Sequence, residues 1–338
     1  MLPLEFNING FLEDFFNLFT YPFVQKALIA GLLIGIMGAI IGVFILLRGL
    51  VFFGEAVAHS AFAGAGLSIL LGMTNPMGLV LLFGIGSALG IEYVNQKKAM
   101  RNEIVLGVIF TATMALAIIF INLATAGYWA VVDINSLIFG NILIITTETF
   151  VTMIVISIFV LFAIIIFKKE LHAITFDAQF AEISGINVDL INYIFIILIA
   201  LVISVSLKAI GAILVFAMLV TPAAAAIQYS FKLNRIIIIA IAFSVISTFL
   251  GIILSFFLNL ASGASIVIIA SLIFVVSFIV SPKRRKSAQF PDECAFCKKY
   301  LTPEERTTCD RSCGITIDHL HTDTKVKIKK AKKERKSN

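Results

Sequence analysis

The sequence predicts an all-α protein, a polytopic transmembrane helical bundle of about eight to nine spans with a short soluble C-terminal tail. Three observations favour this fold class. The 338-residue chain is 60% hydrophobic and has a mean hydropathy of +1.04. Only 14% of its residues are charged, whereas ordinary soluble domains have roughly a quarter. Apolar runs of span length also recur along residues 1–281, which we expect to form the transmembrane domain.

Charge differs between this domain and the tail. Residues 1–281 hold 10 Lys/Arg and 12 Asp/Glu, a net charge of −2, whereas residues 282–338 hold 16 and 8, a net charge of +8. We therefore expect a cytoplasmic basic tail near anionic membrane lipid, with no nucleic-acid partner. The first 20 residues lack the basic n-region of a signal peptide, and an amphipathic segment at the membrane surface is expected there.

Each crossing of the hydrocarbon core needs roughly 20 apolar residues. Nine runs approach that length, although two of them, 77–94 and 191–207, are short. The other seven are 24–47, 51–72, 104–124, 149–167, 210–228, 236–258 and 264–281. The apolar stretch 137–146 has only ten residues, so a re-entrant or surface segment is expected.

Positive charges in the loops predict the orientation of these spans. If the N-terminus lies outside, twelve of the 14 Lys and Arg up to residue 286 fall on one side of the membrane, and only Lys26 and Lys208 fall on the other. Basic loops stay in the cytoplasm. We therefore expect a multi-pass protein of the cell membrane, with its N-terminus outside and its C-terminus in the cytoplasm.

Ionisable residues at bilayer depth are costly, and the pair Glu55 and His59 is the clearest case. The two are four residues apart, so a helix places both on one face. At about 1.5 Å per residue, His59 lies roughly 12 Å into its span. A carboxylate and an imidazole suit Mn²⁺, Fe²⁺ or Zn²⁺ better than Cu⁺, which prefers sulfur. A Glu–His ion pair that only neutralises itself between helices fits the spacing equally well.

Segments along residues 20–281 resemble, in the same order, the metal-ion family of ABC permeases, which are manganese, zinc and iron importers. They are YPFVQKALIAG (21–31), LRGLVFFGEAVAHSAFAG (47–64), NEIVLGVIF (102–110), LIFGNIL (137–143), FDAQFAEISGINV (176–188), KAIGAILVFAMLVTPAAAA (208–226) and ASGASIVI (261–268). Several segments in the right order are more specific than any one alone.

The resemblance implies a permease that moves a divalent transition-metal ion into the cytoplasm. Its implied partners are cytoplasmic ABC ATPase subunits, an extracytoplasmic metal-binding protein and a second permease copy. The chain has no GxxxxGK[ST] phosphate loop, so it is not expected to be an enzyme, and ATP hydrolysis would reside in a partner chain. No cofactor is expected in the permease body.

The resemblance also bears on particular residues. It favours Glu55 and His59 as transport-pathway residues, although the family usually has Asp where Glu55 stands, which leaves the ion preference open. It implies that residues 176–188 form the segment that couples to the ATPase. Asp177 and Glu182 would be polar contacts on a short helix there, and Gly185 would end that helix.

The tail, residues 282–338, is not part of the family pattern and contains all four cysteines. These are Cys294, Cys297, Cys309 and Cys313, followed by His319 and His321. In a reducing compartment such clustering favours a metal site over disulfides, and a tetrahedral Zn²⁺ site is the natural form. Loosely structured free thiols are the alternative interpretation.

Two other functions are compatible with the sequence. A permease for chelated iron or cobalamin shares the ATP-driven architecture, but it should have a larger pathway with few ligands, which the pair Glu55 and His59 disfavours. A membrane-anchored metal sensor would use the cysteine-rich tail as its working part. Nine spans with ionisable residues are more than an anchor requires.

Overall fold

The computed structural model describes residues 21–73, 75–97, 102–126, 145–258 and 260–281. The chain divides into the units Met1–Val280 and Ser281–Asn338. All helices described below belong to the first unit. The expected surface segment in the first 20 residues, nearly all of the stretch 137–146, and the cysteines of the tail lie outside the described residues.

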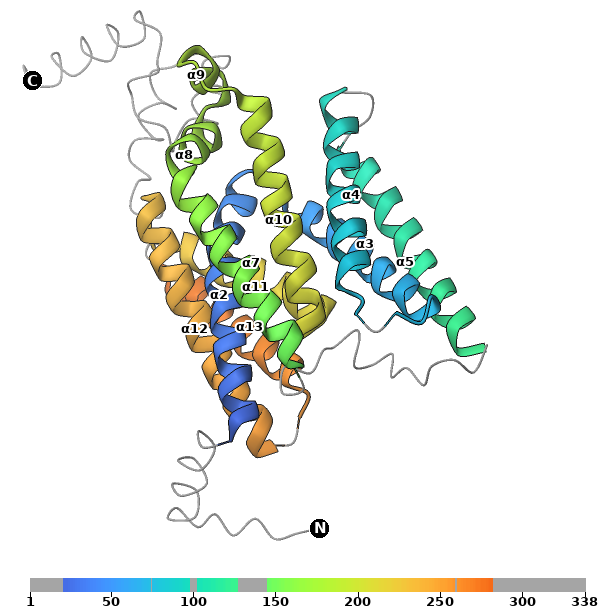
Figure 1. Ribbon diagram of the computed structural model, residues 1–338. Helices are drawn as coiled ribbons and strands as arrows, with labels where there is room; N and C mark the ends of the chain where they lie inside the picture. The colour runs from blue at the N-terminus through green and yellow to red at the C-terminus, as the bar shows by residue number, and fades with distance from the viewer. Residues whose placement is uncertain (1–20, 74, 98–101, 127–144, 259, 282–338) are drawn as a thin grey trace, which may run out of the picture. The chain divides into compact units, whose positions relative to one another are not determined.

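Within the described ranges, nine helices coincide with the nine predicted runs (Figure 1). They are α2 (Pro22–Leu47), α3 (Val51–Leu70), α4 (Met77–Gln96), α5 (Asn102–Ala126), α7 (Thr147–Ile166), α10 (Val188–Ile210), α11 (Ala212–Ile227), α12 (Leu233–Leu258) and α13 (Ser262–Val280). Two shorter helices, α8 (Lys168–Phe176) and α9 (Ala178–Ile183), connect α7 to α10. The described part of the chain is all-helical, as predicted.

Seven of these helices are long and apolar enough to cross a membrane, and α3 and α11 are not among them. The 16 residues of α11 extend only about 24 Å, less than the hydrocarbon thickness of about 30 Å. The 20 residues of α3 include Glu55 and His59, which lower its hydropathy. Both helices pack among neighbours, α11 against α2 and α13, and α3 against α4 and α5. The predicted count of eight to nine spans is thus approximately correct.

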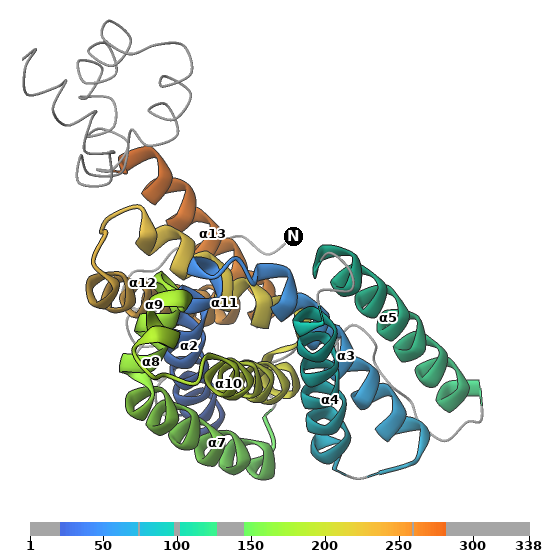
Figure 2. The same ribbon diagram turned by 90° about the horizontal axis from the view of Figure 1, so that it is seen from above.

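The helices form two groups, and α10 lies between them (Figure 2). In one group α3 packs against α4 and α5. In the other, α2 packs against α11 and α12, and α13 packs against α11 and α12. Because α10 contacts α3 and α4 in one group and α2 and α11 in the other, and α3 also contacts α11 directly, the two groups share one core.

Small residues allow several of these helices to approach closely. A methyl group built at Gly42 of α2 would overlap the carbonyl oxygen of Leu219 in α11. By contrast, methyl groups at Gly86 and Gly90 of α4 would meet nothing within 4 Å. Gly86 and Gly90 lie on the exposed face of α4, whereas a methyl group at the buried Gly84 would overlap Ser204 Oγ of α10. Small residues therefore mark a close helix contact on only one face of α4.

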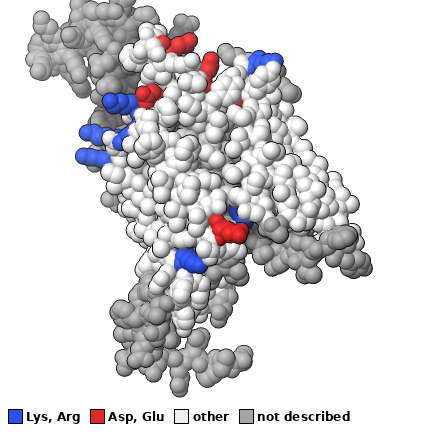
Figure 3. Space-filling model, viewed as in Figure 1, with Lys and Arg blue, Asp and Glu red and all other residues white. Residues whose placement is uncertain are grey.

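Charged side chains leave a broad uncharged band across the face shown in Figure 3. On one side of this band lie the charges near α8 and α9, and on the other a smaller group. Near the start of α2, Lys26 Nζ donates a hydrogen bond to Thr147 Oγ1, and near the end of α10, Lys208 Nζ donates one to Asn75 Oδ1, each at 3.1 Å. An uncharged band of this kind is expected of a body embedded in lipid.

Candidate functional site

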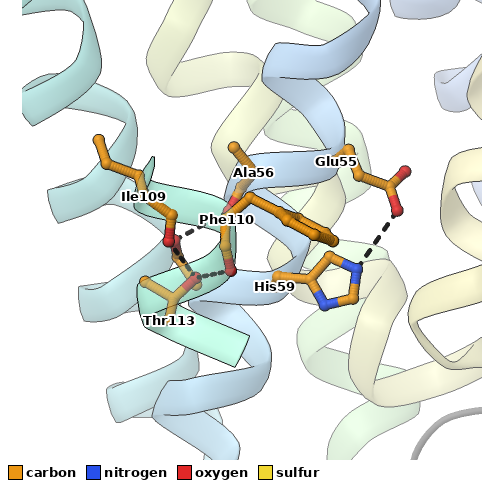
Figure 4. Close-up of polar contacts among 7 residues, drawn as sticks. Glu55, Ala56, His59, Ile109, Phe110 and Thr113 are labelled. Atoms are coloured by element: carbon orange, nitrogen blue, oxygen red, sulfur yellow. Dashed lines mark hydrogen bonds and ion pairs between the residues drawn. The ribbon is translucent and has the colours of Figure 1, made fainter. Parts of the chain in front are cut away.

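The first turns of α3 place Glu55 and His59 next to each other. The helix begins at Val51, so both side chains project from one face with His59 one turn further along. Glu55 Oε1 and His59 Nε2 are 3.3 Å apart (Figure 4). The spacing in the sequence predicts this proximity, and the structure contains it.

Each partner of this pair retains a second polar atom that is free to bind something else. Glu55 Oε2 and His59 Nδ1 are buried and have no hydrogen-bond partner among the residues that the structure describes. Buried polar atoms without a partner cost free energy, so such atoms require an explanation. The side chains themselves are 31% and 16% exposed for Glu55 and His59. The two unpartnered atoms are thus buried, while other parts of both side chains remain accessible.

The position of α5 fixes the other side of the imidazole. The Phe110 ring meets the His59 ring edge to face, with centroids 4.5 Å apart and planes at 86° (Figure 4). Seven residues further along both helices, a methyl group at Gly66 would lie 3.1 Å from the carbonyl oxygen of Ala117. The absence of a side chain at Gly66 thus lets α5 approach α3, and this approach brings Phe110 onto His59. Sequence reasoning did not identify Phe110, because nothing in its local pattern distinguishes it from other apolar residues of α5.

The donor set fits a divalent ion that is bound only in part by this chain. Carboxylate oxygen and imidazole nitrogen are ligands that Mn²⁺, Fe²⁺ and Zn²⁺ accept. No group of three or more His, Cys, Asp or Glu gathers anywhere in the described residues. The pair supplies two ligating side chains, whereas such ions take four to six ligands. Water or another chain would have to complete the coordination.

The segment expected to couple to an ATPase forms α9 and its two ends. Asp177 Oδ1 accepts a hydrogen bond from the Phe180 amide at 2.9 Å and so caps the helix. Gly185 follows the helix with a φ of +86°, a conformation that favours glycine. Glu182 is exposed between them. Apolar residues are exposed on the same short helix, with Phe180 66% and Ile183 85% accessible.

Comparison with known proteins identifies the family. The sequence profile of the ABC 3 transport family matches residues 20–281. The chain belongs to the ABC 3 transport family. The match spans the helices α2 to α13 and excludes the tail, so the cysteine cluster is an addition to the family domain.

Relatives of this ABC 3 family member are named as components of manganese transport and import systems. The manganese transport system membrane protein MntC of Listeria monocytogenes is 39% identical over 268 residues, which cover 79% of this chain and 94% of MntC. The manganese import system permease protein ScaB of Streptococcus gordonii is 34% identical over 269 residues, which cover 80% of this chain and 95% of ScaB. This chain is accordingly an ABC transporter permease embedded in a membrane.

A solved structure has the same fold. PsaBC from Streptococcus pneumoniae, determined in complex with a Fab, contains a chain that is 31% identical to this family member and superposes with a TM-score of 0.72. The alignment covers 81% of this chain and 98% of the other. The helical arrangement described above is therefore similar to that of an experimentally determined chain.

Proposed function

We propose that this chain is the permease subunit of an ATP-driven importer of Mn²⁺, with ATP hydrolysed by a separate subunit. The observation that carries the proposal is the pair Glu55 and His59, whose atoms Oε2 and Nδ1 are buried without partners on the helix α3. The relatives named as manganese transport and manganese import proteins support Mn²⁺ as the ion.

The chemistry of the pair suits transport better than storage. Mn²⁺ binds a given set of N and O ligands more weakly than Fe²⁺ or Zn²⁺ does. A site with one carboxylate and one imidazole, completed by water, would hold the ion briefly and release it. Zn²⁺ and Fe²⁺ would bind the same ligands, so selection would depend on the ion supplied to the permease and on the geometry of Glu55.

A second permease copy would complete the pathway. Phe52, Glu55 and His59 follow the spacing i, i+3 and i+7 and so share one face of α3. On this face Phe52 is 69% exposed and Glu55 is partly exposed. A partly exposed carboxylate is costly in lipid, whereas a carboxylate beside an apolar ring suits the interface with an identical chain. Two copies would bring two carboxylates and two imidazoles to one ion.

The remaining partners would bind at opposite ends of the helices. The exposed residues Phe180 and Ile183 of α9, together with Asp177, Glu182 and Gly185, would form the docking segment for the ATPase on the cytoplasmic side. An extracytoplasmic metal-binding protein would deliver the ion at the opposite end, where Lys26 and Lys208 lie. This placement assigns the N-terminus to the outside and the tail to the cytoplasm, in agreement with the distribution of basic loops.

Uptake into proteoliposomes tests the proposal. The full chain, reconstituted with its co-purifying ATPase and supplied with Mn²⁺ and its binding protein, should accumulate Mn²⁺ only when ATP is present. Replacing Glu55 or His59 by Gln should reduce uptake by about tenfold or more. Accumulation of chelated iron or cobalamin in place of the free ion would refute the proposal in favour of a chelate permease. Absence of any uptake would favour the metal-sensor interpretation.

The tail supports a second, smaller proposal. We propose that Cys294, Cys297, Cys309 and Cys313 bind a structural Zn²⁺ ion, because thiolates clustered in a reducing compartment prefer this ion. Histidine at 319 or 321 is an alternative fourth ligand. The basic residues that follow would hold the tail near anionic lipid.

A further inference from the structure

Arg48 occupies the tight turn that joins α2 to α3. The amide of Gly49 donates a hydrogen bond to the carbonyl of Leu46 (3.2 Å), and the amide of Leu50 donates one to the carbonyl of Ile45 (2.9 Å). These two bonds, with a φ of +70° at Gly49, form a Schellman motif that ends α2. Because α3 begins at the residue after Leu50, a displacement of Arg48 would be passed directly to the helix that carries the Glu55–His59 pair.

The side chain of Arg48 connects this turn to two other helices. Its Nε donates a hydrogen bond to Thr175 Oγ1 (3.0 Å) and its Nη1 donates one to Asn192 Oδ1 (3.1 Å). Its Nη2 lies 3.5 Å from the carbonyl oxygen of Leu171. The guanidinium carbon is 4.5 Å from the centroid of the Phe195 ring. Leu171 and Thr175 belong to α8, and Asn192 and Phe195 belong to α10.

These contacts depend on the shape of the guanidinium as well as on its charge. Burial lowers the pKa of Arg48 to about 10, and the charge of Glu92 opposes this effect. The group is therefore charged at neutral pH. Among the described residues no carboxylate forms an ion pair with it, so the groups in direct contact with the charge are neutral oxygens and an aromatic face, and Glu92 acts only at longer range. A planar fork of donors can satisfy several such acceptors at once, whereas a lysine ammonium cannot.

The segment that Arg48 contacts continues into the proposed docking surface. Thr175 lies in the last turn of α8, and Asp177, two residues later, caps α9. Thr175 Oγ1 also donates a hydrogen bond to the carbonyl of Leu171 at 2.6 Å, so the two α8 residues that Arg48 contacts lie on one turn of that helix. If α9 docks to an ATPase, as the proposed function holds, these contacts link the docking helix α9 to α3 through α8 and Arg48.

We propose that Arg48 is a positioning residue that couples the α8–α9 segment to α3, so that movement imposed on α9 by an ATPase reaches the Glu55–His59 pair. The coupling depends on the simultaneous contacts with Thr175 and Asn192. Charge alone does not provide it, so Arg48→Lys is expected to break the coupling as Arg48→Gln does.

Hydrogen exchange of the full chain in detergent tests the anchoring without requiring transport. In Arg48→Lys, amides of residues 168–183 should exchange about tenfold faster than in the unsubstituted chain, while those of α12 stay unchanged. The matched control Lys26→Gln removes one exposed hydrogen bond to Thr147 at the other end of α2 and should leave residues 168–183 unchanged. Unchanged exchange in Arg48→Lys would overturn the proposal, as would faster exchange throughout the chain.

Transport measurements test the coupling itself. In complexes of Arg48→Lys with the co-purifying ATPase, Mn²⁺ uptake per ATP hydrolysed should fall by about tenfold, although the amount of bound ATPase is the same. Unaltered uptake per ATP, or a loss of uptake that only follows a loss of bound ATPase, would overturn the proposal. If the unsubstituted complex moves no Mn²⁺, the proposed function fails, and the exchange comparison still decides whether Arg48 anchors α8.

Discussion

Replacing Gly42 by alanine should separate α2 from α11 and destabilise the bundle. A methyl group at Gly42 would overlap the carbonyl oxygen of Leu219 and would lie 2.8 Å from its carbonyl carbon and 3.3 Å from its Cα. Carbon atoms attract at about 3.5 Å or more, so the carbonyl carbon must move away by at least about 0.7 Å, and the overlapping oxygen by more. The neighbouring atoms belong to the backbone of α11, so rotation of a side chain cannot relieve the overlap.

The expected cost is about 3 kcal/mol, at the upper end for overpacking because backbone must shift. For a domain of this size that corresponds to a fall in Tm of roughly 6–12 °C, which thermal unfolding of the purified chain in detergent, followed by circular dichroism, would detect. In the control Gly86→Ala, the added methyl group lies in open space on α4, and the substitution should stabilise the chain by about 0.5–1 kcal/mol. Equal melting temperatures for the two variants would refute the packing argument.

Three further predictions concern the site, the coupling segment and the tail. Glu55→Asp shortens the carboxylate by one methylene and should change the ratio of Mn²⁺ to Zn²⁺ uptake by about tenfold; an unchanged ratio in competition assays would remove Glu55 from the pathway. Asp177→Ala loses the cap of α9, worth about 1 kcal/mol, and should retain less ATPase in pull-down assays, whereas Asp177→Asn, which can still cap, should bind normally. After dialysis the full chain should retain about one Zn²⁺ more than a chain that ends at Lys286. Equal zinc content of the two chains by mass spectrometry would exclude a zinc site in the tail.

Much of the fold could be predicted because the membrane imposes simple rules on the sequence. Apolar runs of span length must become helices, since the backbone has no other partner in lipid. Two of the predicted spans, α3 and α11, are not long and apolar enough to count as membrane spans, and each has a physical reason. Polar site residues reduce the hydropathy of α3, and α11 is short because other helices surround it.

Glycine spacing was a poorer guide to helix packing. Gly42 and Gly86 both occur in glycine-rich helices, yet only Gly42 meets another backbone. Local spacing identifies which residues share a face, but the position of the neighbouring helix decides which face is buried. That position is set by the whole bundle.

In the candidate site, too, the sequence predicts local contacts but not contacts between distant residues. The proximity of Glu55 and His59 follows from helical periodicity and could be predicted. Arg48 lies 127 residues from Thr175 and 144 from Asn192 in the sequence, and Phe110 reaches His59 only because α5 packs on α3. Such contacts arise from tertiary packing, which no local pattern encodes.

The most direct test of the central claim is pulsed electron paramagnetic resonance of Mn²⁺ bound to the chain. Removing residues 287–338 leaves two histidines, His59 and His172, so a nitrogen coupling to Mn²⁺ can be assigned to one of them. The account predicts a histidine nitrogen coupling that is lost in His59→Gln and retained in His172→Gln. A coupling that persists in His59→Gln, or bound Mn²⁺ with no histidine coupling at all, would contradict it.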